Sequence, residues 1–156
     1  MKKILLVVVI IIFITLLLPL AIVWLIGGGG EGQSPIESGT VSVYVSEEDC
    51  VKDMDINEYL KCVVAAEMPA DFEEEALKAQ AVAARTYLYS HIAEKDKGNI
   101  AESHNGAAIC TDSTHCQAYI SEDKRRESWG AGAEENWNKI STAVDETTGQ
   151  IMRDYE

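Results

Sequence analysis

The sequence predicts an α+β fold in which an N-terminal transmembrane helix precedes a helix-rich domain with a short β-strand region at its start. Three observations predict it. Residues 4–26 form one long apolar run, residues 41–46 alternate between apolar and polar side chains, and later segments repeat apolar residues every three or four positions. These patterns are typical of a membrane span, a strand with one buried face and amphipathic helices.

The apolar run is interrupted only by Thr15 and Pro19. It exceeds the roughly 20 residues that a helix needs to cross a hydrocarbon core. Lys2 and Lys3 precede it, and positive charge on the short side favours a cytoplasmic N-terminus. We therefore expect a single-pass cell-membrane protein with an anchor at residues 1–26 and an extracytoplasmic domain. A cleaved signal peptide is the alternative, although its apolar core is typically about 7–15 residues long.

The remainder of the chain predicts one linker and one domain. Residues 27–39, with the sequence GGGGEGQSPIESG, have the composition of a flexible linker. Residues 40–156 are enough for a single modest domain. Acidic residues outnumber basic ones by 26 to 13, for a net charge of −13, which disfavours binding to nucleic acid.

The first predicted helix runs from residue 56 to about residue 67. Asp55 and Glu58 have the spacing of a helix-starting pair, and Pro69 disfavours helical geometry at Met68. Glu67 follows Val63 by four residues and so continues the apolar face. A carboxyl group at this place, near the negative end of the helix dipole, is a candidate general acid. The alternative is that Glu67 simply turns outward at a fraying helix end.

Two further helices are predicted. One opens at Asp71 and Glu74, which repeat the capping pattern, and runs from residue 72 to about residue 94. The other runs from residue 134 to about residue 145 and would bury Trp137. The charged residues 122–127 between them are expected to form a solvated loop.

Two segments resemble the signature of the stage II sporulation protein D (SpoIID) family. They are residues 59–69, YLKCVVAAEMP, and residues 75–87, EALKAQAVAARTY. The resemblance implies a peptidoglycan lytic transglycosylase, which cleaves glycan strands without water and leaves 1,6-anhydro-muramic ends. It further implies that Glu67 is the catalytic residue and that the preferred substrate is glycan from which a partner amidase has removed the stem peptides.

Lys78 and Arg85 match signature positions that the resemblance places around the active-site groove. They are seven residues apart and share a helix face. A guanidinium can hold the lactyl carboxylate of peptide-free muramic acid, so both are candidate substrate-binding residues. In the alternative interpretation, Lys78 pairs with Glu74 and Arg85 braces the helix corner.

His104, Cys110, His115 and Cys116 offer two imidazoles and two thiolates, the ligand set of a structural zinc site. Residues 111–119 also resemble a loop of the family in which some members carry a metal. We therefore expect zinc. A disulfide between Cys110 and Cys116 is the alternative, and the states of Cys50 and Cys62 stay open.

Family members usually continue well beyond the last residue of this chain, so we expect an incomplete SpoIID-like domain. Two functions follow as hypotheses. The first is the enzyme, acting on peptidoglycan glycan strands during sporulation and engulfment. The second is a non-catalytic, membrane-anchored interaction module that docks to engulfment or wall-remodelling partners.

Overall fold

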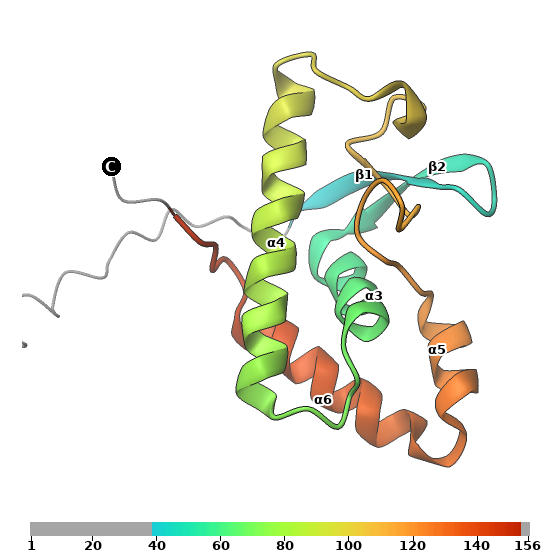
Figure 1. Ribbon diagram of the computed structural model, residues 1–156, viewed down its shortest axis with the longest axis vertical. Coiled ribbons are helices and arrows are strands. Elements are labelled where there is room, and N and C mark those ends of the chain that lie inside the picture. The colour runs from blue at the N-terminus through green and yellow to red at the C-terminus, as the bar shows by residue number, and fades with distance from the viewer. Residues whose placement is uncertain (1–38, 154–156) are drawn as a thin grey trace, which may run out of the picture. The chain divides into compact units, whose positions relative to one another are not determined.

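The computed structural model describes residues 39–153, which form helices with one small sheet. The sheet contains β1 (Thr40–Val45), β2 (Cys50–Asp55) and β3 (Ile109–Cys110) in the order β2-β1-β3. The helices are α3 (Ile56–Glu67), α4 (Glu74–Asp96), α5 (Glu122–Trp129) and α6 (Ala133–Glu146), with two short 3-10 turns, η2 (Glu102–His104) and η3 (Gly130–Gly132). Figure 1 shows α3 in the middle of these elements, with α4 on one side and α5 on the other.

The predicted fold class included a transmembrane helix, and this part of the prediction is corrected by the structure. No helix within residues 39–153 is both long enough and apolar enough to cross a membrane. The fold that the structure shows is α+β, made of helices and a small sheet. Residues 4–26, on which the membrane prediction was based, and most of the predicted linker 27–39 lie outside the described part of the chain.

The sheet joins parts of the chain that are far apart in sequence. β1 pairs with β2 in antiparallel register and with β3 in parallel register, so that Val43 lies opposite both Lys52 and Ile109. The alternation predicted for β1 is confirmed, since its three valines are buried. β2 was not predicted. It is an edge strand whose residues are mostly exposed on both faces, which removes the alternation that identifies a strand.

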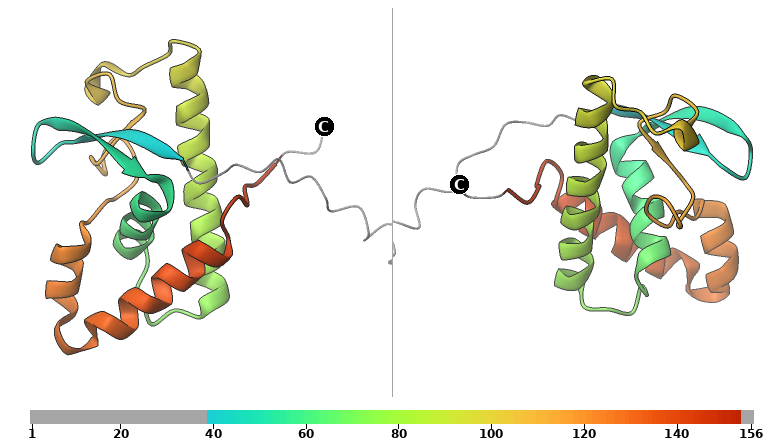
Figure 2. Two further views of the ribbon diagram at one scale, coloured as in Figure 1. Left: turned by 180° about the vertical axis from the view of Figure 1, so that it is seen from behind. Right: turned by 45° about the horizontal axis from the view of Figure 1, so that its top comes forward.

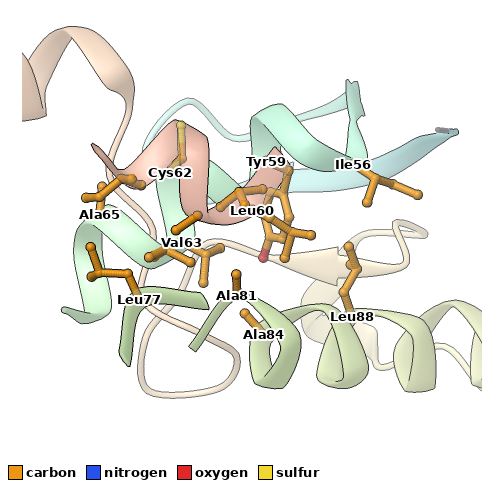
Figure 3. Close-up of a cluster of buried hydrophobic side chains, with 14 of the residues drawn as sticks. Ile56, Tyr59, Leu60, Cys62, Val63, Ala65, Leu77, Ala81, Ala84 and Leu88 are labelled. Atoms are coloured by element: carbon orange, nitrogen blue, oxygen red, sulfur yellow. The ribbon is translucent and has the colours of Figure 1, made fainter. Parts of the chain in front are cut away.

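α3 has the boundaries that the sequence predicts. The Asp55 carboxylate accepts hydrogen bonds from the amides of Asn57 (2.8 Å) and Glu58 (3.1 Å), which confirms the predicted N-cap. Met68 is extended ahead of Pro69, as the steric restriction on a residue before proline requires. The apolar residues of α3 pack against one face of α4, made by Leu77, Ala81, Ala84 and Leu88 (Figure 3).

The other helices differ from the prediction in detail. α4 begins at Glu74 rather than residue 72, and its N-cap, Glu73, makes no side-chain capping bond, so the predicted Asp71 cap is wrong. Residues 122–127 are not a loop but most of α5, in which no residue is fully buried. Arg126 pairs with Glu122 (2.5 Å) inside this helix and with Glu134 (2.7 Å) of α6, so the second ion pair ties the two helices together.

α6 was predicted almost at its true bounds, and Trp137 is buried as expected. The two views in Figure 2 show α6 crossing the ends of α3 and α4, opposite the sheet. The 25 residues between α4 and α5, numbered 97–121, are mostly irregular and pass beside β1 through β3. This irregular segment and the C-terminal end of α3 carry the residues considered next.

Candidate functional site

Glu67 is the last residue of α3, and its side chain is exposed. Its Oε1 atom accepts a hydrogen bond of 2.7 Å from the backbone amide of Ala118, in the irregular segment before α5. Within the described residues this is the one polar contact of the carboxylate. The side chain therefore neither lies in the core nor turns freely into solvent. One oxygen is fixed by a peptide N–H, and the other makes no hydrogen bond within residues 39–153.

The residues that follow Ala118 run along α3. The ring of Tyr119 stacks on that of Tyr59, with centroids 5.8 Å apart and planes inclined by 17°. The amide of Ile120 donates to the carbonyl oxygen of Cys62 at 3.4 Å. Three consecutive residues of this segment, 118–120, are thus each tied to a residue of α3. Sequence reasoning missed Ala118 because its contribution is a backbone N–H, which no residue type encodes.

Lys78 lies among carboxylates. Its ammonium group is 2.8 Å from Glu74, 3.0 Å from Glu75 and 2.7 Å from Glu146. Hydrogen bonds to these three groups raise the pKa of Lys78 above its usual range. The pairing with Glu74 weighed in the sequence is present, and two further partners accompany it.

Arg85 is buried, with 1% of its surface exposed. Its guanidinium donates to the carbonyl oxygens of Val144 (3.0 Å), Thr147 (2.6 Å) and Gln150 (3.5 Å) and to the side-chain oxygen of Asn57 (3.3 Å). Burial lowers the pKa of Arg85. The side chain supplies partners to carbonyls at the C-terminal end of α6, which a helix leaves unsatisfied. This arrangement matches the bracing interpretation.

The two basic residues are not brought to Glu67. No hydrogen bond or ion pair among residues 39–153 joins Glu67 to Lys78 or Arg85. Within the described residues, the predicted catalytic carboxylate and the predicted substrate-binding cations therefore make no direct polar contact.

The four predicted metal ligands do converge. One ligand atom from each of His104, Cys110, His115 and Cys116 lies within 4.8 Å of every other. The Nε2 atom of His104 is 3.1 Å from Nδ1 of His115 and 3.2 Å from Sγ of Cys116, while Sγ of Cys110 is 3.6 Å from Nδ1 of His115. All four cysteines of the chain are free, so Cys110 and Cys116 form no disulfide.

We call these four residues, His104, Cys110, His115 and Cys116, the His/Cys cluster. Local structure brings them together. His104 ends η2, and Cys110 lies in β3 beside β1. Between Cys110 and His115 the chain turns at Asp112, whose side chain accepts from the amide and hydroxyl of Thr114 (2.9 and 2.7 Å) and whose carbonyl accepts from the amide of Cys116 (2.7 Å). The turn brings the last two ligands back toward the first two.

The cluster fits a metal ion better than it fits a set of neutral side chains. Two imidazoles and two thiols in contact contain few good hydrogen-bond pairs, because a thiol is both a weak donor and a weak acceptor. Burial raises the pKa of Cys110 to about 11 and lowers that of His104. Around a divalent cation, by contrast, two nitrogens and two sulfurs complete a tetrahedral shell of the kind that structural zinc takes.

Comparison with known proteins gave matches over most of the domain. A family model described as SpoIID, stage II sporulation protein, matches residues 44–153. Stage II sporulation protein D of Bacillus amyloliquefaciens is 35% identical over 120 residues, which are 77% of this chain and 33% of the relative. The protein of the same name from Bacillus subtilis strain 168 is 35% identical over 124 residues, 78% of this chain and 35% of the relative.

A third relative matches a shorter stretch. An uncharacterized protein of Brachyspira hyodysenteriae is 55% identical over 42 residues, 27% of this chain and 11% of that protein. The chain spans about a third of the length of the two Bacillus relatives.

Proposed function

The chain belongs to the SpoIID family of stage II sporulation proteins, and on this premise we propose that it is a lytic transglycosylase that cleaves peptidoglycan glycan strands. Membership of the family supports a role in sporulation. The observation that carries the finer proposal is the Glu67 carboxylate, held through one oxygen by the Ala118 amide at the end of α3. A carboxyl group fixed in this way has a defined direction in which to give and take a proton.

One carboxyl group is sufficient for the reaction. Protonated Glu67 gives its proton to the oxygen that links N-acetylmuramic acid to N-acetylglucosamine, and the C1–O bond breaks as positive charge develops at C1. The carboxylate then takes the proton of the C6 hydroxyl of the same muramic acid, whose oxygen closes onto C1. The product is a 1,6-anhydro ring, and Glu67 is again protonated. No water and no second carboxylate take part, unlike in ordinary glycosidases.

A hollow lies beside the residues that follow Ala118. Its volume is about 770 Å³, within the range typical of ligand sites, and its lining includes Tyr119, Met54 and Lys52. Neither Glu67 nor Ala118 lines the hollow, but Tyr119 directly follows Ala118, so the hollow is a candidate site for part of a glycan chain that reaches Glu67. The preferred strand lacks stem peptides, which makes an amidase the enzyme that supplies it. Engulfment proteins are the partners expected to act with it.

The His/Cys cluster is proposed to hold a zinc ion. Four protein ligands leave no open position, so the ion would serve to fix the fold of the loop. The substrate-binding role proposed for Lys78 and Arg85 finds no support in their contacts, which use both side chains inside the domain.

The proposal is tested by digestion of peptide-free glycan strands. The parent protein should release fragments with 1,6-anhydro-muramic ends, detected by mass spectrometry. Glu67→Gln should lower this rate by about 10²–10⁴-fold, the usual contribution of a general acid–base group. Glu73→Gln is the matched control, because Glu73 is an exposed glutamate that makes no side-chain capping bond. Equal rates for Glu67→Gln and the parent would rule out the mechanism. If even the parent releases no anhydro ends, the interaction-module alternative is favoured.

A further inference from the structure

The His/Cys cluster and the candidate catalytic residue are joined by a very short stretch of chain. Cys116 is a member of the cluster, and Ala118, two residues later, donates its N–H to Glu67. Two residues span at most about 7 Å of extended chain. A shift of Cys116 is therefore transmitted almost directly to the amide that holds the carboxylate.

On the far side of Ala118 the segment is fixed by α3 itself. Tyr119 stacks on Tyr59, and Ile120 donates to the carbonyl oxygen of Cys62. Both contacts belong to the same helix that ends in Glu67. On the near side, the corresponding anchor is the cluster, since residues 111–116 are mostly exposed and bend through the Asp112 turn. The direction of the Ala118 N–H thus depends on a helix at one end and on the cluster at the other.

Two orphaned polar atoms lie in this same part of the domain. The hydroxyl of Tyr59 and Oε1 of Gln117 are buried without a hydrogen-bond partner within the described residues. Tyr59 is 1% exposed, and its ring lies under that of Tyr119. The side-chain oxygen of Gln117 therefore does not fix the chain between Cys116 and Ala118. The position of this segment depends on the contacts at its two ends.

We propose that Cys116 and Ala118 are positioning residues, through which metal binding at the His/Cys cluster fixes the orientation of the Glu67 carboxylate. The inference rests on the proposed function for its catalytic consequence, but not for the coupling itself. Catalytic groups must be held to within about 0.5 Å, and a metal ligand two residues away restricts the movement of the Ala118 amide. Loss of the ion releases the near end of the segment, and Ala118 then no longer meets Glu67 in one fixed geometry.

Amide hydrogen exchange, measured by NMR without substrate, tests the coupling. In the zinc-loaded protein the Ala118 N–H should be protected. Removal of zinc with a chelator should speed its exchange at least about tenfold, the factor that corresponds to one lost hydrogen bond. Amides in the middle of α4 and α6 should keep their rates. Glu67→Gln should shift the Ala118 amide proton signal in the loaded protein while zinc still binds.

Two results would overturn the inference. One is an Ala118 exchange rate that does not change when a zinc-sensitive dye shows the ion to have left. The other is equal acceleration in α4, α6 and Ala118, since zinc would then hold the whole fold rather than this segment. Both are read without glycan, so they are independent of whether the protein is a transglycosylase.

A pair of variants extends the test to activity. Ala118→Pro removes the N–H donor, and Ala118→Gly retains it. With zinc present, the proline variant should lose kcat by about tenfold or more with a smaller change in KM, while the glycine variant should stay near the parent. Equal kcat for the two variants, with zinc bound to both, would contradict the positioning role. Should the proline variant fail to fold, the exchange experiment on the parent still decides.

Discussion

Two irregular stretches of this domain are held by opposite kinds of polar group. Residues 147–150, after α6, are held by Arg85, a buried side chain that is always charged and supplies several donors to backbone carbonyls. Residues 104–116, before α5, are brought together at the His/Cys cluster, whose four members lack good partners in one another. The first arrangement is complete from the protein's own atoms, whereas the second is the one that we propose a zinc ion completes. Stability on one side should therefore be insensitive to metal, and on the other side should depend on it.

The largest effect is expected from Arg85→Met. The substitution removes the guanidinium donor from the carbonyls of Val144 and Thr147, which still accept from the amides of Thr147 and Gln150. A hydrogen bond from a charged group contributes about 1.5–3 kcal/mol. We expect a loss of about 3 kcal/mol in the free energy of unfolding, measured in urea with zinc present or absent. Lys78→Met is the matched control, because its ion pairs lie at the surface, and its urea midpoint should stay near that of the parent. Equal shifts for the two variants would break the comparison.

The next effect concerns the metal. Above its dissociation constant, each tenfold rise in free zinc should add about 1.4 kcal/mol to the unfolding free energy of the parent. Cys110→Ala, which lacks a ligand, should show no such dependence, and Arg85→Met should keep the slope of the parent with a constant offset. If the free energy of unfolding of Cys110→Ala still rises with the zinc concentration, the ion binds elsewhere.

The smallest effect is expected from Cys62, a buried thiol that belongs neither to the contacts of Arg85 nor to the His/Cys cluster. Burial raises the pKa of Cys62 to about 11 from an ordinary value of 9.0. Below pH 9 the thiol is protonated in both the folded and the unfolded chain. As the pH rises from 9 toward 11, the Cys62 thiol loses its proton in the unfolded chain before it does so in the folded one. Ionisation therefore favours the unfolded chain, and the free energy of unfolding declines. At pH 10 the loss is about 1 kcal/mol.

Cys62→Ala should be free of that decline. The measurement is the urea midpoint of the variant and the parent at several values of pH between 8 and 11, with the difference between them as the readout. The alanine variant should start lower, because it loses packed volume, and approach the parent as the pH rises. If the urea midpoints of the two proteins keep a constant difference across this pH range, the pKa of Cys62 is not raised in the folded protein.

The sequence predicted those parts of the molecule whose residues carry their own pattern. The valines of β1 alternate because one face is buried, and α3 is marked by the Asp55 cap and by Pro69. The cluster could be predicted because imidazole and thiol side chains are rare and chemically distinctive. In each of these cases the side chain that is read from the sequence is also the group that acts.

The remainder is held by contacts that the residue letters do not show. β2 is an exposed edge whose pairing is made by backbone atoms, and α5 is a charged segment with one ion pair within the helix and one to α6. For Arg85 the sequence left a substrate-binding role and a bracing role open, because it shows a cation on a helix face but not the carbonyls packed against it. The contact between Ala118 and Glu67 spans 51 residues and uses a peptide N–H, so only the three-dimensional structure reveals it.

The two-residue strand β3 determines when the metal ligands can meet during folding. Cys110 lies on β3, which pairs with β1 alone, and the adjacent bond from Ala108 to Ser42 closes a loop of 66 residues. Closing so long a loop before other contacts exist is entropically unfavourable, so this pairing follows the assembly of the helices. The proposed zinc ion would therefore be captured late, by a chain that is already collapsed, and a cell short of the ion would accumulate a folded but metal-free precursor rather than an unfolded one.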